Sequence, residues 1–240
     1  MKTIGLIGGM SWESTAVYYR LINEAVKARL GGLHSAPCVL YSVDFAVVEE
    51  HQRQGRWQEA ERFLVNAAQS VERAGAEFLL ICTNTMHKVA EAVQAGIGIP
   101  LLHIADATAA AIQRAGVRQV GLLGTRFTME EEFYRGRLTE RHGLPVLIPN
   151  PEDRAAVHRI IYEELCLGTV RPDSKVQMAT MMSRLVEAGA EGIVLGCTEL
   201  DLLVQGEDCC VPLFDTTREH ALEAVELALK PGPDRGVVTR

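Results

Sequence analysis

Two short polar segments stand at matching places in the sequence, and each carries a side chain that can exchange a proton. The segments Thr83–Thr85 and Cys197–Glu199 both follow an apolar run, and an offset of 114 residues places Thr83 on Cys197. A hydroxyl and a thiol that face one substrate from two sides could remove a proton from one face of a carbon and return one to the other. We therefore take Thr83 and Cys197 as candidate catalytic residues.

Cys197 is the strongest nucleophile or base candidate among the six cysteines. It stands where a predicted strand ends and a helix is expected to begin, and free N–H groups and the helix dipole there favour a thiolate and lower the pKa. Cys38 and Cys166 lie within strand-like and helix-like runs, and strand alternation turns Cys82 away from Thr83. We interpret these three as core residues.

The elements that position these residues alternate between strand and helix. Strand-like apolar runs stand at 3–7, 37–43, 78–82 and 120–124, and helical spacing of apolar residues stands at 13–30 and 57–74. Glycine pairs or single glycines separate most of these runs. Such alternation predicts an α/β fold, with parallel strands covered by helices on both faces.

The chain repeats its own pattern. The segments Ile4–Gly8, Ala74–Glu77 and Ile99–Leu102 are echoed, at offsets of 116, 114 and 112 residues, by Val120–Gly124, Ala188–Glu191 and Val211–Phe214. We predict two similar doubly wound parallel-sheet domains related by internal pseudo-symmetry. Ligands bind at the carboxyl ends of strands in such sheets, so we expect the active site in the cleft between the halves.

The repeat also suggests where the halves begin and end. We expect residues 1–103 plus 216–230 to form the first half and residues 104–215 the second. The helix at 216–230 follows the completed second half, so we expect it to pack back on the first. Thr216 and Glu219 have the spacing of a capping box at its start.

Composition narrows the class of protein. The 240 residues are 48% hydrophobic and 23% charged, with a net charge of −7, which is typical of a globular chain without a nucleic-acid or membrane partner. No apolar run approaches the ~20 residues of a membrane span, and the first residues do not resemble a signal peptide. Six cysteines without a CxxC pair indicate reduced thiols and a cytoplasmic protein.

Other kinds of site are disfavoured by missing motifs. Gly8-Gly9 lacks the remaining glycines and the lysine of a phosphate-binding loop. No histidines have metal-ligand spacing, so we expect no metal. No serine stands in a Gly-x-Ser-x-Gly elbow, which disfavours a hydrolase triad.

Several motifs together resemble the PLP-independent aspartate/glutamate racemase family, and its aspartate racemase branch in particular. They span roughly residues 2–230 and comprise Ile4–Ser14, the surroundings of Phe45 and Gln52, Thr83–Thr85 with His87, His103–Asp106 and Gly196–Leu200. The resemblance implies cofactor-free racemisation of a small amino acid by two proton-transferring groups. It also implies a homodimer, in keeping with the prevalence of two-fold symmetric assemblies.

Two positions depart from the family pattern. The family usually has Cys-Asn-Thr at the first site, whereas this chain has Thr83, and Cys82 is one residue too early to replace that thiol. A hydroxyl is a poor base but can donate or relay a proton, so we expect the two directions of the reaction to differ. The resemblance implies that the L enantiomer is the better substrate. The second departure is Cys166, where relatives often have a lysine that pairs with a substrate carboxylate.

The resemblance also implies a set of substrate-binding residues. They are Met10, Gln52, Asn84, Thr85, Thr198 and Glu199. Gln52 offers amide donors for a carboxylate, and Glu199 could accept from the substrate ammonium or simply favour its helix start. Ser11 and Thr125 are weaker candidates, because Ser11 could simply cap the helix at 13–30. We expect His87 and His103 to orient the backbone.

The expected function is racemisation of aspartate, glutamate or both. Two alternatives stay open at this point. A single-cysteine enzyme of the maleate isomerase or malonate decarboxylase kind would also work with one thiolate, and a non-catalytic amino-acid-binding protein would need none. The sequence does not rank aspartate against glutamate, since one methylene is discriminated by the width of the cleft.

Overall fold

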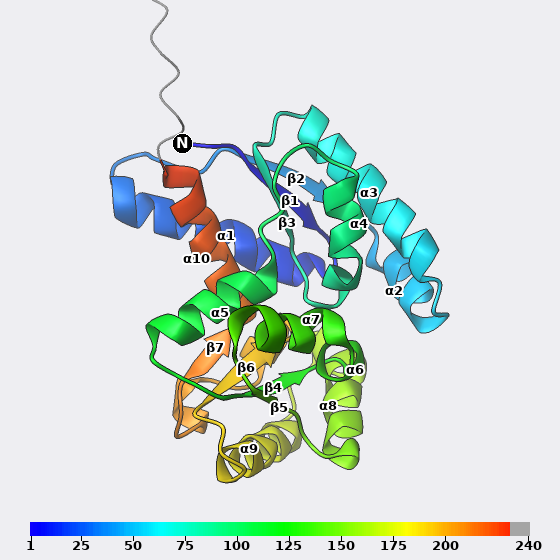
Figure 1. Cartoon of the computed structure of the whole chain (residues 1–240), viewed down its shortest axis with the longest axis vertical. Helices are drawn as coiled ribbons and strands as arrows, with labels where there is room; N and C mark the ends of the chain where they lie inside the picture. Colours follow the sequence, from blue (N-terminus) through cyan, green and yellow to red (C-terminus); the bar gives the residue numbers. More distant parts are fainter. Residues whose placement is uncertain (231–240) are drawn as a thin grey trace, which may run out of the picture.

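The computed structural model describes residues 1–230 and contains two parallel sheets, one in each half of the molecule (Figure 1). The first sheet has the order β2-β1-β3, with strands β1 (Ile4–Gly8), β2 (Cys38–Ser42) and β3 (Phe78–Ile81). The second has the order β5-β4-β6-β7, with strands β4 (Val120–Gly124), β5 (Val146–Leu147), β6 (Gly192–Gly196) and β7 (Leu213–Asp215). The predicted α/β fold with parallel sheets is confirmed.

The two sheets are built in the same register. Ile4 of β1 lies opposite Phe78 of β3, and Val120 of β4 lies opposite Gly192 of β6. Val120 follows Ile4 by 116 residues and Gly192 follows Phe78 by 114 residues, which are offsets of the sequence repeat. Leu101 adds a parallel bridge on the outer side of β3, in the place that β7 takes beside β6. The predicted pseudo-symmetry of the two halves is therefore present in the strand pairing itself.

Helices cover both faces of the first sheet. One face packs on α1 (Trp12–Leu30) and α10 (Thr216–Leu229), and the other on α3 (Trp57–Arg73) and α4 (Ala90–Ala95). Successive strand residues point to opposite faces, so Leu6 belongs to the α1 side and Ile7 to the α3 side. The short helix α2 (Phe45–Arg53), which follows β2, was not anticipated from the sequence.

The second half has one continuous core. Its helices are α5 (Ile104–Arg114), α6 (Arg126–Glu130), α7 (Glu132–Gly136), α8 (Pro151–Glu163) and α9 (Pro172–Glu187). Helices α5 and α10 pack against each other. Helix α5 follows the Leu101 bridge of the first sheet but contributes to the core of the second half, and α10 follows β7 of the second sheet but contributes to the core of the first half. This exchange supports a division into residues 1–103 plus 216–230 and residues 104–215, which stays a prediction.

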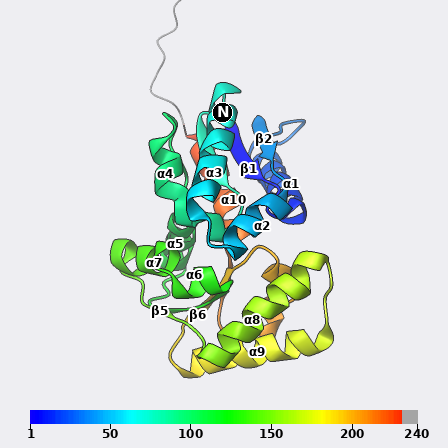
Figure 2. The same cartoon turned by 90° about the vertical axis from the view of Figure 1, so that its right-hand side faces the viewer.

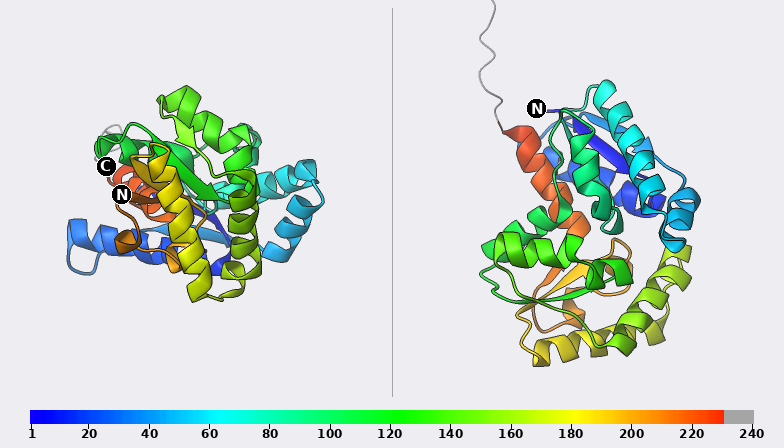
Figure 3. Two further views of the ribbon diagram at one scale, coloured as in Figure 1. Left: turned by 90° about the horizontal axis from the view of Figure 1, so that it is seen from below. Right: turned by 45° about the vertical axis from the view of Figure 1, so that its right-hand side comes forward.

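The two lobes stand one above the other in Figure 2, and α10 runs along the first lobe towards the second in the right-hand view of Figure 3. The same view shows the upper end of α8 close to α2, so the lobes meet on this side as well. Within residues 1–230, no helix is long and apolar enough to cross a membrane.

The start of α10 differs from the prediction. Asp215 caps the helix by accepting a hydrogen bond from the Thr217 N–H at 2.9 Å. Thr216 is already the first helical residue, and its buried hydroxyl donates to the Leu195 carbonyl at 2.9 Å. The capping box expected from Thr216 and Glu219 is therefore wrong by one residue, because the β7 carboxylate takes the capping place.

Candidate active site

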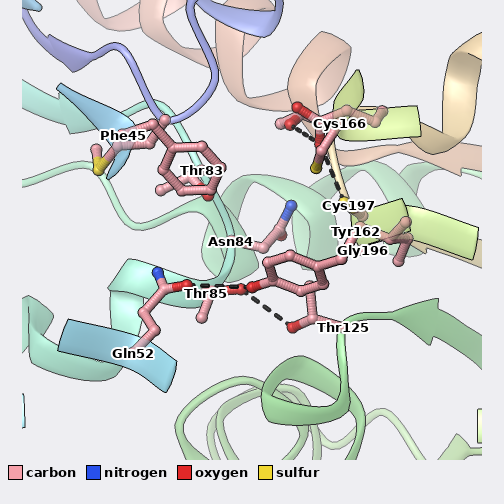
Figure 4. A pocket seen from close by; sticks show the side chains of 14 residues that line it. Phe45, Gln52, Thr83, Asn84, Thr85, Thr125, Tyr162, Cys166, Gly196 and Cys197 are labelled. Atoms are coloured by element: carbon pink, nitrogen blue, oxygen red, sulfur yellow. Dashed lines mark hydrogen bonds between the residues drawn. The ribbon is translucent and has the colours of Figure 1, made fainter. Parts of the chain in front are cut away.

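A narrow cavity lies between the two halves, where the carboxyl ends of their strands meet (Figure 4). Its volume is about 20 Å³, which is room for about one water molecule. All eight residues predicted to act in catalysis or binding line this cavity: Met10, Gln52, Thr83, Asn84, Thr85, Cys197, Thr198 and Glu199. The structure thus brings together residues that are up to 189 positions apart in the sequence.

The two candidate proton-transferring groups belong to different walls. In Figure 4, Thr83 lies on the side formed by the first half, and Cys197 lies across from it. Thr83 follows β3 and Cys197 follows β6, which are equivalent strands of the two sheets. Cys82 is fully buried in the core between the first sheet and helices α1 and α10, so its predicted core position is confirmed.

The backbone of Thr83 is held by a neutral histidine. Nδ1 of His87 donates to the Thr83 carbonyl at 2.7 Å, and Nε2 accepts from the Ile104 N–H at 3.2 Å. Burial, followed by the neighbouring His103, holds the pKa of His87 well below its usual range. Nδ1 of His103 accepts from the Ala105 N–H at 3.1 Å. Both histidines orient backbone groups, as predicted.

A buried carboxylate stands beside the thiol. Oε2 of Glu199 accepts from Sγ of Cys197 at 3.1 Å and from the Thr198 hydroxyl at 2.7 Å. Oε1 accepts from the Ser11 hydroxyl at 2.8 Å. Cys197 is only 8% exposed and Glu199 only 5%. The arrangement gives the thiol proton an acceptor within direct reach.

The electrostatics of Cys197 run against the sequence-based expectation. Burial, together with the nearby Glu199 carboxylate, raises the pKa of Cys197 well above its usual value. The helix expected at this strand end is only the 3-10 turn Leu200–Leu202. A turn of this length has almost no macrodipole. The predicted lowering of the pKa is therefore wrong for the substrate-free site, which holds a thiol.

The Thr83 strand end is followed by a longer helical segment, the 3-10 helix Thr85–Val89, which leads into α4. Asn84, which precedes this 3-10 helix and lines the cavity, is only 2% exposed. Its Nδ2 donates to the Thr216 hydroxyl at 3.0 Å, whereas its Oδ1 has no hydrogen-bond partner within residues 1–230. An unpaired buried acceptor is costly, which points to a donor supplied by a ligand.

Hydrogen bonds tie the two halves together around the cavity. The Tyr162 hydroxyl of α8 donates to Oε1 of Gln52 in α2 at 3.1 Å, and the hydroxyls of Thr85 and Thr125 are 3.1 Å apart. Nε2 of Gln52 donates only to Sδ of Met86, at 3.0 Å. A thioether is a weak acceptor, so this amide donor can readily turn to a carboxylate.

Sequence reasoning did not single out Ile161 or Tyr162, which line the cavity. Cys166 packs against the core of the second half, as interpreted, and also lines the cavity, and burial raises its pKa to about 12. Tyr162 lies in α8, which ends at Glu163, and Cys166 lies in the following 3-10 helix Leu165–Leu167, so helical spacing did not predict that both reach the cavity. Among the described residues that line the cavity, none is lysine or arginine.

The cavity between two matched α/β halves has a thiol on one wall and a hydroxyl on the other, and such groups could exchange protons with a small molecule. The model of the family described as Asp/Glu/Hydantoin racemase matches residues 7–224. The chain therefore belongs to the Asp/Glu/hydantoin racemase family, and its class of activity is that of the amino-acid racemases.

Similar proteins agree with this assignment. The crystal structure of a candidate Asp/Glu racemase from Yersinia pestis is 57% identical, with a TM-score of 0.90 over 96% of this chain and 100% of that chain. An aspartate racemase homologue from Pyrococcus horikoshii OT3 is 38% identical, with a TM-score of 0.82 over 95% and 99%. The broad specificity amino-acid racemase RacX of Bacillus subtilis (strain 168) is 21% identical over 227 residues, which are 89% of this chain and 92% of that protein.

Proposed function

We propose that this enzyme racemises an acidic amino acid, aspartate or glutamate, without a cofactor and with a preference for the L enantiomer. The observation that carries the proposal is the placement of Thr83 and Cys197 on opposite walls of one cavity, with Glu199 hydrogen-bonded to the thiol. A substrate Cα held between these walls can lose its proton on one face, and the resulting planar carbanion can gain one on the other.

The proposed reaction starts on the Cys197 side. The thiol gives its proton to Oε2 of Glu199, and the thiolate then takes the Cα proton of the L substrate. The Thr83 hydroxyl delivers a proton to the opposite face of the carbanion and is reprotonated from water through a relay. Glu199 releases to water the proton that it took from Cys197, which restores the starting state. In the reverse direction Thr83 would have to act as a base, for which a neutral hydroxyl is poorly suited.

A bound amino acid would itself bring a positive charge to this site. A substrate ammonium in the cavity would offset the burial and the Glu199 charge that raise the pKa of Cys197. Oδ1 of Asn84 is the unpaired acceptor that this ammonium can satisfy. The carboxylate of the substrate could take Nε2 of Gln52 from its sulfur partner.

Substrate binding requires the halves to separate first. A cavity of about 20 Å³ holds about one water molecule, and an amino acid is several times larger. The contacts Ser11–Glu199, Gln52–Tyr162 and Thr85–Thr125 all cross from one half to the other. They are the contacts that opening would break and closure over the substrate would restore.

One observation favours a second candidate function, the racemisation of amino acids with neutral side chains. No lysine or arginine stands among the described cavity-lining residues, and Cys166 occupies one wall. A substrate side-chain carboxylate would therefore be held by neutral donors alone, close to Glu199. The Bacillus subtilis relative is described as having broad specificity.

Deuterium exchange at Cα tests the proposal. The protein is incubated in deuterated water with L-aspartate, L-glutamate or a panel of neutral L-amino acids, and Cα deuterium and enantiomer composition are measured. Exchange with the acidic substrates supports the proposal, and exchange with neutral ones alone favours the second candidate. No exchange with any amino acid would leave a binding protein or a single-thiol isomerase or decarboxylase.

The homodimer and the cytoplasmic location complete the proposal. All six cysteines are free thiols in the structure, as a reducing compartment would keep them. Sedimentation equilibrium of the purified protein would decide between a monomer and a dimer.

A further inference from the structure

Ser11 joins the two halves at the reacting thiol. It lies between β1 and α1, in the first half, and is 7% exposed. Its hydroxyl donates to Oε1 of Glu199 at 2.8 Å, although the two residues are 188 positions apart. The same carboxylate accepts from Cys197 through its other oxygen. The Glu199 carboxylate thus lies between Ser11 and the Cys197 thiol, and Ser11 acts on the thiol only through this carboxylate.

The Ser11 hydroxyl is fixed by the helix that it caps. Its oxygen accepts from the Ser14 N–H at 3.3 Å, and its carbonyl accepts from the hydroxyls of Ser14 and Thr15 at 3.1 and 2.7 Å. The single hydroxyl proton has two acceptors in reach, Oε1 of Glu199 at 2.8 Å and the Ser14 hydroxyl at 3.4 Å, and the shorter contact with a carboxylate is the stronger one. Capping α1 and contacting Glu199 are therefore compatible roles of one side chain.

The Glu199 carboxylate needs such a partner to keep one orientation. Its Oε2 is shared by Cys197 and Thr198, which both belong to the same loop as Glu199 itself. Ser11 is the partner from outside this loop, and it holds the other oxygen. Without it, the carboxylate can rotate and present Oε2 elsewhere.

We propose that Ser11 is a positioning residue that holds the Glu199 carboxylate with Oε2 against the Cys197 thiol, and that it does so only when the two halves are closed. The inference rests on the proposed function, because it assigns Ser11 a role in the proton transfer of that same site. It makes thiol activation depend on closure, since the donor and the carboxylate come from different halves.

The effect should therefore fall on turnover and not on substrate affinity. We expect Ser11→Ala to lower kcat by about tenfold or more, as misplacement of a catalytic group by a fraction of an ångström does, with KM changed less than about twofold. Ser11→Thr keeps the hydroxyl and the capping oxygen and should restore most of the turnover. Ser14→Ala removes a neighbouring hydroxyl that does not contact Glu199 and serves as the matched control.

A double-mutant cycle separates positioning from mere capping. Ser11→Ala is measured in the wild type and in a Glu199→Gln background by Cα deuterium exchange over long incubation, with thermal unfolding as the folding check. We expect the Ser11→Ala loss to be largely absent when Glu199 is already replaced, because the two residues act as one unit.

The outcomes distinguish this inference from the proposed function. A wild type that exchanges no deuterium overturns the proposed function. An active wild type with an unchanged Ser11→Ala kcat, or an equal loss in both backgrounds, overturns the positioning role and leaves Ser11 as a helix cap. A loss confined to the Glu199-containing background and rescued by Ser11→Thr supports it.

Discussion

The two strand ends that face the cavity occupy equivalent places in the two sheets but differ in what they put beside the reacting group. After β6, the Cys197 thiol donates to the buried carboxylate of Glu199. After β3, Thr83 carries a hydroxyl, and the titratable neighbour, His87, is neutral and bonded to the Thr83 carbonyl. The duplicated fold therefore repeats positions, whereas the chemistry at each position depends on the local side chains.

This asymmetry has a thermodynamic limit. The equilibrium constant between two enantiomers is one, so kcat/KM must be equal in the two directions. A weak base on the Thr83 wall can therefore show itself only in kcat and KM separately. The predictions below test the two walls against each other.

Replacing the thiol should have the largest effect. We expect Cys197→Ala to lower exchange and racemisation by about 10³-fold or more, because the Cys197 thiolate is the group proposed to take the Cα proton. Chiral chromatography and Cα deuterium exchange measure this loss, and circular dichroism checks the fold. Substantial remaining turnover would remove Cys197 from the mechanism.

Removing the hydroxyl should have the next largest effect and should separate the two faces. We expect Thr83→Ala to lower racemisation by about 10²-fold while some deuterium exchange into the L enantiomer remains, because Cys197 can still remove and return a proton on its own face. Parallel loss of exchange and racemisation would show that the walls do not act independently.

Giving the first wall a thiol should reduce the asymmetry. We expect Thr83→Cys to raise kcat on the D enantiomer by about tenfold, since a thiolate is a better base than a neutral hydroxyl. Progress curves from pure L and pure D substrate, for wild type and variant, give kcat and KM in each direction. Equal wild-type kcat values for both enantiomers, unchanged by the substitution, would contradict the role assigned to Thr83.

The raised pKa of Cys197 should be visible without substrate. Burial and the Glu199 charge favour the thiol, so alkylation of Cys197 by iodoacetamide should be slow at pH 7 and increase about tenfold per unit of rising pH. Exposed Cys210 is an internal reference that should react first. Mass spectrometry of the two peptides follows both thiols at once. Fast alkylation of Cys197 at pH 7 would mean that the free site already holds a thiolate.

The smallest effect on activity is expected for the cysteine next to the first wall. Cys82 is fully buried and faces the α1 and α10 side of the sheet. We expect Cys82→Ala to keep kcat within about twofold and to lower the free energy of unfolding by about 1 kcal/mol. Urea unfolding and steady-state kinetics measure the two effects. If Cys82→Ala lost as much kcat as Cys197→Ala while its stability stayed normal, the reacting group on the first wall would be Cys82 and not Thr83.

Much of the fold and of the cavity wall could be predicted from the sequence because both depend on local patterns. Apolar runs, glycine turns and helical spacing can be recognised in the sequence, and the repeat places Thr83 and Cys197 at equivalent strand ends. The carboxyl ends of parallel strands meet at one edge, so residues following those strands are brought together whatever the details of packing.

The tertiary structure alone decided which side chains meet across the cleft and how they are charged. Tyr162 reaches Gln52, and Ser11 reaches Glu199, only because the two halves pack face to face. The pKa of Cys197 was predicted in the wrong direction from its place in the chain. Its value depends on how completely the packed halves exclude water and on the orientation of Glu199, which Ser11 of the other half contacts, and residue spacing encodes neither burial nor orientation.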